Sequence, residues 1–195
     1  MNGSALGRNG SAILVLVAIA AALVAAKSAP SSRGIPPETV ADYVHAVIEA
    51  DRAIYTKHVV DRMQEKGIIA ASENWETQNT LPLPAQFLID AARLVAKKDN
   101  GIRYRLVSLW PIYERNGPAT EFERTALQAI QKHPEKPYTG YAETGRRRYF
   151  QAIYSDVAVA QACIGCHNAH PNSPRRDFKL HDVMGGIIIT IPLDQ

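Results

Sequence analysis

The sequence has only two cysteines, and both lie in one short stretch near its C-terminal end. So few cysteines exclude the multiple disulfides that hold many small secreted proteins together. Charge of one sign is also scarce, because the formal net charge is +3 and the longest basic run is three arginines at 146–148. This excess is too small to predict nucleic-acid binding. With 46% hydrophobic and 21% charged residues, the composition is that of a globular protein.

Residues 11–26, SAILVLVAIAAALVAA, form a long apolar run, and a segment rich in proline, serine and glycine follows it. A membrane span usually needs about 20 apolar residues, so this run fits either a cleaved signal peptide or a short membrane anchor. The sequence leaves both alternatives open. In either case we expect residues 1–35 to export or anchor the chain, and residues 36–195 to form one domain in the periplasm.

Hydrophobic periodicity predicts helices early in this domain and strands later. Apolar residues recur at three- and four-residue steps over 38–66, which predicts a long helix closed by Gly67. Further helices are predicted over 84–101 and 119–133, with a short one at the cysteines. Alternation and β-forming residues predict strands over 102–113, from residue 146, and over 184–193. This order indicates an α+β fold, an antiparallel sheet with helices on one side.

The two cysteines belong to the motif Cys163-x-x-Cys166-His167, which several kinds of site could explain. A structural zinc site would have to crowd four ligands into residues 163–170, since there is no second cysteine pair. A thioredoxin-like redox pair would follow a strand in a βαβ unit, which the sequence pattern does not contain. A disulfide and a chance occurrence are the remaining simple explanations.

Covalent haem explains both the spacing of the cysteines and the adjacent histidine. Each thiol adds to one haem vinyl group, and the residue after the second cysteine is held beneath the iron as its axial ligand. Attachment takes place outside the cytoplasm, in agreement with an export segment. The sequence therefore favours one haem c, attached to Cys163 and Cys166, with His167 as proximal ligand. We expect the other ring nitrogen of His167 to donate to a backbone carbonyl.

The residue on the opposite side of the iron decides what a haem protein can do, and His58 is the sequence's candidate for this distal ligand. It follows Val47, Asp51 and Ile54 at helical steps, so the periodicity places it on the apolar stripe of the long helix. The same periodicity places His45 on the solvated side.

Other residues are weaker candidates near a haem. The sulfurs of Met63 and Met184 could also ligate iron, although filling the core is the commoner role of methionine. The two haem propionates need basic or hydroxyl partners, and Arg52, Arg105 and Tyr104 are candidates that the sequence cannot rank.

Several blocks of the sequence resemble a known family: RAIYTKHVV, LPLPAQFL, YRLVSLWPIYERNGPATEFERTAL and CIGCHNAHPNSPRRDFKLHDVMGGIIITIPL. They look like the signature of a c-type haem domain family with a PAS-like fold. This family was formerly catalogued as a domain of unknown function, is found in cyanobacteria and proteobacteria, and also forms the sensory input of histidine kinases. The resemblance extends from about residue 43 to residue 193.

The resemblance implies a five-stranded antiparallel PAS-like sheet flanked by helices, with haem attached at Cys163 and Cys166 and ligated by His167. Some relatives take the sixth ligand from a cysteine near the first long helix. This sequence has no third cysteine, which favours His58 as the substitute.

Together these features predict an extracytoplasmic single-haem c-type cytochrome, six-coordinate, that acts in electron transfer or redox sensing with an unidentified redox or signalling partner. The alternative is a haem-based sensor of a gas or small ligand, with an open or displaceable distal site. No acid pair or nucleophile–base arrangement is readable near the motif, so no enzymatic activity is predicted. A peroxidase-like enzyme would need a distal acid–base pair that the sequence does not locate.

Overall fold

The structure is a computed structural model that describes residues 34–193. These residues belong, apart from Gly34, to a unit that begins at Ile35. The predicted signal or anchor segment, residues 11–26, lies outside the described residues. Within residues 34–193, no helix has the length and apolar character needed to cross a membrane.

A nearly continuous helix opens the domain, as the periodicity predicts. It comprises α2 (Pro37–Ile54), the π-helical segment η1 (Tyr55–Asp61) and α3 (Arg62–Glu65). Pro37 stands in the first turn, where the missing N–H of proline costs no hydrogen bond. Gly67, with a φ of 64°, follows the last turn. Helices of the π type are rare and are frequent at functional sites, and η1 borders the cavity described below.

Four strands form the main sheet, in the order β3-β6-β5-β4, and all neighbours are antiparallel. They are β3 (Arg103–Val107), β4 (Tyr138–Thr144), β5 (Arg147–Val157) and β6 (Val183–Pro192). The predicted α+β fold is confirmed, but the sheet has four strands in the described residues, not five. A separate parallel pair, β1 (Ala71–Ser72) with β2 (Leu81–Pro82), lies outside this sheet.

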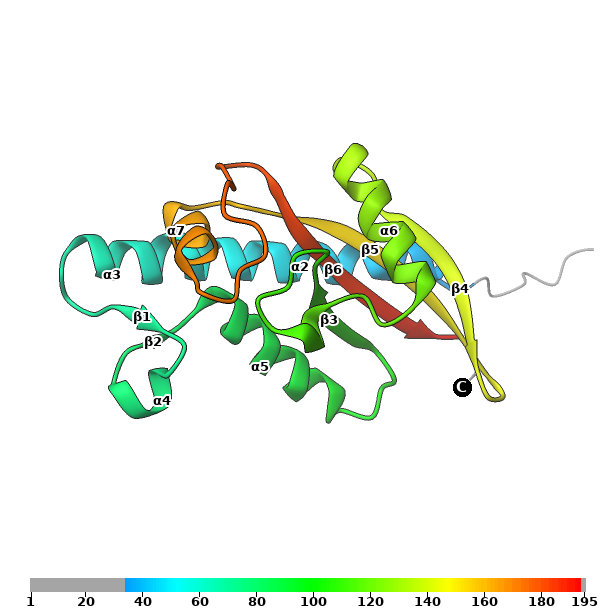
Figure 1. Cartoon of the computed structure of the whole chain (residues 1–195). Coiled ribbons are helices and arrows are strands. Elements are labelled where there is room, and N and C mark those ends of the chain that lie inside the picture. Colours follow the sequence, from blue (N-terminus) through cyan, green and yellow to red (C-terminus); the bar gives the residue numbers. More distant parts are fainter. Residues whose placement is uncertain (1–33, 194–195) are drawn as a thin grey trace, which may run out of the picture. The chain divides into compact units, whose positions relative to one another are not determined.

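Helices cover both faces of the sheet, which corrects the prediction that they lie on one side (Figure 1). On one face, α2 and α5 (Pro84–Ala96) pack against a core that includes Leu88 and Ile189. On the other face, α6 (Glu121–Lys132) packs Leu127 and Ile130 against Ile188. Successive residues of a strand point to opposite faces. The apolar run of β6 therefore fills both cores at once, as is usual for a strand buried on two sides.

Three shorter elements complete the described chain: α4 (Trp75–Gln78), the 3₁₀ turn η2 (Glu114–Asn116) and α7 (Gln161–Ala169). Helix α7 is the predicted short helix at the cysteines. It covers a third apolar cluster in which Phe178 and Met184 are buried and Cys163 is partly buried.

The buried face of the long helix is not the one predicted. Ala41 and Ile48 are buried on α2, whereas Val47 and Ile54 are 62% and 58% exposed. His45, predicted to be solvated, is half-buried and stacks on Tyr154 with ring centroids 3.9 Å apart. Helix α2 carries two apolar stripes, and periodicity alone does not say which of them meets the sheet.

Gly185 lies where β6 passes the end of β3, and it provides a test of this packing. A Cβ atom at this position would overlap the carbonyl oxygen of Val107. Overpacking typically costs about 1–3 kcal/mol, so we expect Gly185→Ala to lower the free energy of unfolding by that amount in urea denaturation. Gly34→Ala is the control, because a Cβ there meets no atom within 4 Å. Equal stability of the two variants would contradict the close approach of β3 and β6.

Candidate functional site

Helix α7 presents the Cys-x-x-Cys-His motif to a cavity of about 700 Å³. Residues three and four apart share one side of a helix, and Cys163, Cys166 and His167 accordingly all line this cavity. Cofactor pockets typically measure about 300–1,000 Å³. Both cysteines are free thiols, and burial raises the pKa of each. The motif thus offers two thiols and an imidazole to a space of cofactor size.

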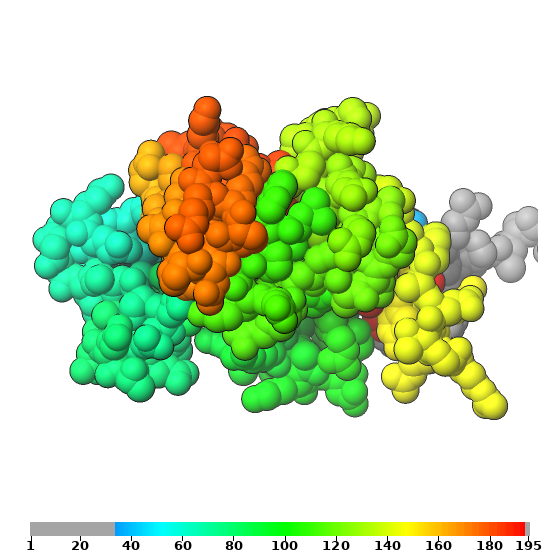
Figure 2. All heavy atoms as spheres, in the orientation of Figure 1, coloured from blue at the N-terminus to red at the C-terminus, as the bar shows by residue number. Residues whose placement is uncertain are grey.

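The other walls of the cavity come from segments far apart in the sequence. In the space-filling view, α7 and the loop after it, in orange, lie beside the β1–α4 segment, in teal, and the loop after β3, in green (Figure 2). The lining includes Arg52 and Val60 of the long helix, residues 71–74 around β1, residues 83–86 at the start of α5, and residues 106–108 and 110–113 at the end of β3 and beyond.

His167 is a buried imidazole with an unsatisfied nitrogen. Its Nδ1 atom is buried without a hydrogen-bond partner, so the predicted bond to a backbone carbonyl is not formed. Burial lowers the pKa of His167, and the nearby charge of Arg52 lowers it further. Both effects favour the neutral ring, which is the form that ligates metals. Buried polar atoms nearly always have a partner, and within residues 34–193 this nitrogen has none.

The loop after α7 fixes the motif helix against the sheet. Asn168 donates from Nδ2 to the carbonyl oxygen of Phe178 at 2.9 Å, and its Oδ1 accepts from the backbone N–H of Phe178 at 3.0 Å. The Phe178 ring meets the His167 ring edge-on, with centroids 5.8 Å apart. The Arg175 guanidinium lies over the rings of Phe178 and Trp110, at 4.3 and 4.8 Å from their centroids. These contacts hold the orientation of the imidazole.

A buried ion pair joins Arg52 of α2 to Asp156 of β5 at the cavity wall. The two side chains are 12% and 10% exposed, and Nε of Arg52 has no hydrogen-bond partner. Burial raises the pKa of Asp156, while the charge of Arg52 opposes this shift. The pair therefore places two opposite charges beside His167 in surroundings of low polarity.

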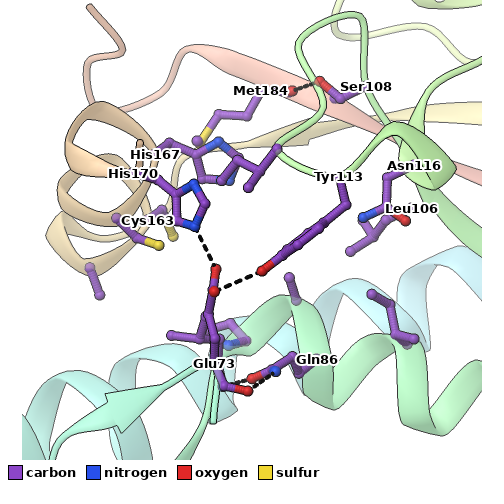
Figure 3. Close-up of a pocket in the computed structure, with 18 of the residues that line it drawn as sticks. Glu73, Gln86, Leu106, Ser108, Tyr113, Asn116, Cys163, His167, His170 and Met184 are labelled. Carbon is purple, nitrogen blue, oxygen red and sulfur yellow. Dashed lines mark hydrogen bonds and ion pairs between the residues drawn. The ribbon is translucent and has the colours of Figure 1, made fainter. Parts of the chain in front are cut away.

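Among the residues that line the cavity, Glu73 connects Tyr113 and His170 (Figure 3). The Tyr113 hydroxyl donates to Glu73 Oε2 at 2.7 Å, and His170 Nε2 lies 3.1 Å from Glu73 Oε1. His170 Nδ1 accepts from the backbone N–H of Asn172 at 3.1 Å, so Nε2 carries the proton in the neutral ring. The hydrogen bond to Glu73 raises the pKa of Tyr113. Sequence patterns do not predict this network, because its members are 40 or more residues apart.

The cavity does not contain His58. This side chain is exposed on η1 and is absent from the lining, so its predicted place on a buried stripe is wrong. The prediction took the wrong face of the long helix as the buried one, which also explains the error for His45. His45 and Met63 do not line the cavity either.

Two other predicted candidates do line the cavity. Arg52 is one of them, in its ion pair with Asp156. Met184 is the other, but it is 5% exposed and packs with Phe178 beneath α7. The remaining candidates for propionate contacts, Tyr104 and Arg105, line a second cavity.

A zinc site is not assembled at the motif. Within residues 34–193, no three side chains among His, Cys, Asp and Glu are placed to hold a metal ion. His170 lies in the same cavity as the cysteines, but it is engaged with Glu73.

The sequence profile of the Tll0287-like family matches residues 36–192. The chain belongs to this family. The match covers the Tll0287-like domain from the start of α2 to the end of β6, with the Cys163–His167 motif inside it.

Among solved structures, the Tll0287-like domain is similar to the crystal structure of the cyanobacterial heme-protein Tll0287, with a TM-score of 0.51 and 19% sequence identity. The similarity covers 83% of this chain and 99% of the other chain. At this level of identity, it establishes a shared PAS-like fold. A comparison with curated proteins finds no match.

The raised pKa of Asp156 gives a prediction for the pH dependence of stability. A carboxyl whose pKa is higher in the folded state contributes its full stability below the pKa of an unfolded aspartate, and loses it as the pH rises through the folded value. Relative to Asp156→Asn, the wild-type protein should therefore lose free energy of unfolding as the pH rises above about 4, the pKa of an unfolded aspartate, measured by urea denaturation.

Asp177→Asn is the matched control, because a hydrogen bond from Arg175 lowers the pKa of this exposed carboxyl. Its contribution is present above the pKa of an unfolded aspartate and is lost as the pH falls, so the slope should have the opposite sign. A pH-independent difference for Asp156→Asn would contradict the raised pKa.

Proposed function

We propose that this chain binds one haem c, attached through thioether bonds to Cys163 and Cys166, with His167 as the proximal ligand. The observation that carries the proposal is that both thiols and the imidazole line one cavity from a single helix side. Two thiols at this spacing followed by histidine are what covalent attachment of haem requires. A zinc site, the main competing use of such residues, lacks its ligand set in the described chain.

The residues present fit such a group in three respects. The cavity has a volume of about 700 Å³, as cofactor sites do. Burial and the charge of Arg52 lower the pKa of His167, which favours the neutral ring that ligates metals. Phe178 holds the ring from its edge, so the imidazole is oriented before anything binds to it. The name of the similar solved structure, a heme-protein, is in agreement with this assignment.

The role we propose is electron transfer or redox sensing outside the cytoplasm. Bound haem would supply an iron that changes its charge by one electron, and the surrounding residues would set the free energy of that change. The Arg52–Asp156 pair and the burial of His167 are the features of this chain that would act on it. The apolar run at 11–26 supports export or anchoring. The partner would be a redox or signalling protein, and no enzymatic step is assigned.

The second candidate function is a sensor of a small ligand, and the position of His58 favours it. A six-coordinate haem needs a second strong ligand, but His58 is exposed and outside the cavity. Apart from the motif itself, the histidine and methionine side chains that line the cavity are His170, which is held by Glu73, and Met184, which is packed beneath α7. A sixth position without a strong protein ligand is open to a gas such as CO or NO.

Attachment can be tested in a host with a c-type maturation system. The wild-type protein should be coloured and carry the mass of one covalent haem, and Cys163→Ser/Cys166→Ser should have the mass of the bare polypeptide. His167→Ala should keep the added mass and change the absorption spectrum, because the thioethers remain while the axial ligand is lost. A colourless wild-type product at polypeptide mass would remove the proposal.

The sixth position can be tested with CO. If it has no strong protein ligand, the reduced protein should bind CO readily, and His58→Ala should leave the absorption spectrum unchanged. Met184→Leu is the matched variant, since this methionine lines the cavity whereas His58 does not. Exclusion of CO by the wild-type protein would favour the six-coordinate electron carrier, and a spectral change in Met184→Leu would identify its sulfur as the ligand.

A further inference from the structure

A second cavity, of about 480 Å³, adjoins the first. It lies along the edge strand β3, where α5 approaches the sheet, and its lining includes residues 103–106 of β3. Ile89, Leu106, Arg115 and Asn116 line both cavities. The two spaces are therefore neighbours that share a wall, with Arg115 on that wall.

Positive charge is concentrated in this second cavity. Four arginines, at positions 93, 103, 105 and 115, line it together with one carboxylate, Glu123. The excess of three positive charges equals the formal net charge of the entire sequence. If acidic and basic side chains were evenly mixed on the surface, one cavity would not collect this excess of positive charge. The lining therefore favours an anion.

Two of the four arginines are already neutralised. Arg105 pairs with Glu123 at 2.6 Å, and the same carboxylate accepts from the backbone N–H of Ala119 at 2.6 Å. Arg93 pairs with Asp90 of its own helix at 2.6 Å. Glu123 is thus occupied and does not offer a free negative charge to the cavity.

The other two arginines are without such partners. In the described part of the chain, no carboxylate forms an ion pair with Arg103 or Arg115. Arg115 lies over the Tyr113 ring, 5.2 Å from its centroid, a contact that leaves its N–H donors available. Arg103 and Arg115 are therefore the charges that a bound anion would meet.

The remaining lining suits an organic carboxylate. The guanidinium group forms paired hydrogen bonds with a carboxylate, which makes arginine the preferred residue for this anion. Tyr104 and Thr190 supply hydroxyl groups, and Gln151 an amide. Ile89, Ala92 and Ile188 supply apolar surface for a carbon skeleton.

We propose that the second cavity is a carboxylate-binding site with Arg103 and Arg115 as its charged anchors. The carboxylate has two sources. One is the pair of propionate groups of a haem in the adjoining cavity, which rests on the proposed function. The other is a small organic acid taken from solution, which does not depend on haem. Both present the same group to the same arginines.

The test uses the full chain loaded with haem and the variant Arg103→Gln/Arg115→Gln. Arg62→Gln/Arg146→Gln is the matched control, because it removes the same total charge from exposed residues that line neither cavity. Arg103→Lys/Arg115→Lys keeps the charge and should restore most of the wild-type behaviour. Each protein is titrated with succinate by calorimetry, and its midpoint potential is measured by spectroelectrochemistry.

If the carboxylate is free, succinate should bind the wild type and the control, and should bind Arg103→Gln/Arg115→Gln roughly tenfold or more weakly, because charged hydrogen bonds are lost. If it is a propionate, succinate should not bind, and the midpoint potential of that variant should lie below the control's. Its iron would be easier to oxidise with two local positive charges removed. Either result supports the site.

The proposal is overturned if succinate binds all the proteins equally, or if it binds none of them and the potentials of the two glutamine variants agree. A protein that holds no haem would instead count against the proposed function. The succinate titration then decides the site on the haem-free chain: binding lost only in Arg103→Gln/Arg115→Gln supports it, and any other result overturns it.

Discussion

The spacing of three residues on one short helix determines where the candidate site of this domain lies. Cys163, Cys166 and His167 face the same way because they are three and four residues apart on α7. The three side chains can act together only if α7 is held in place and the cavity in front of it stays open. Asn168 supplies the first condition through its two hydrogen bonds to Phe178. The segments around Glu73 and Tyr113, which form the opposite wall, supply the second.

The two cavities differ in how their charges are balanced. In the first, Arg52 is matched by Asp156 at close range, so the wall beside His167 has little net charge. In the second, no carboxylate of residues 34–193 forms an ion pair with Arg103 or Arg115. A group with an uncharged, flat body and negatively charged substituents would find suitable surroundings for both of its parts. This complementarity connects the proposed cofactor with the proposed anion site, although the two proposals are tested separately.

Local patterns in the sequence predicted much of this structure. The long first helix, the helix over 119–133, the helix at the cysteines and the last strand all follow from periodicity and end signals, and all are present. Strand β4 was missed, because this edge strand contains Thr, Gly and Glu in place of a clear apolar alternation. The motif identified Cys163, Cys166 and His167 as neighbours because they lie within one short stretch of sequence.

The wrong predictions of residue positions share one physical cause. The true positions depend on contacts between segments that are distant in the sequence. Helix α2 has two apolar stripes, and only its packing on the sheet shows that Ile48 faces inward and Val47 outward. The predicted burial of His58 depended on that choice and was wrong. The connection of Glu73 to Tyr113 and His170, and the gathering of four arginines in one cavity, are likewise set by tertiary structure. Sequence patterns do not show which of these side chains meet in the folded chain.

The position of β6 in the sheet has a consequence for the order in which the protein matures. It is the last strand of the described chain, yet it lies between β3 and β5 and pairs with both. During synthesis, β3 therefore has no neighbour in the described sheet until β6 follows. The cysteines precede that segment in the chain, so they emerge while the domain is still open. Under the proposed covalent attachment, the enzyme that modifies these thiols would have access to them before the last strand inserts.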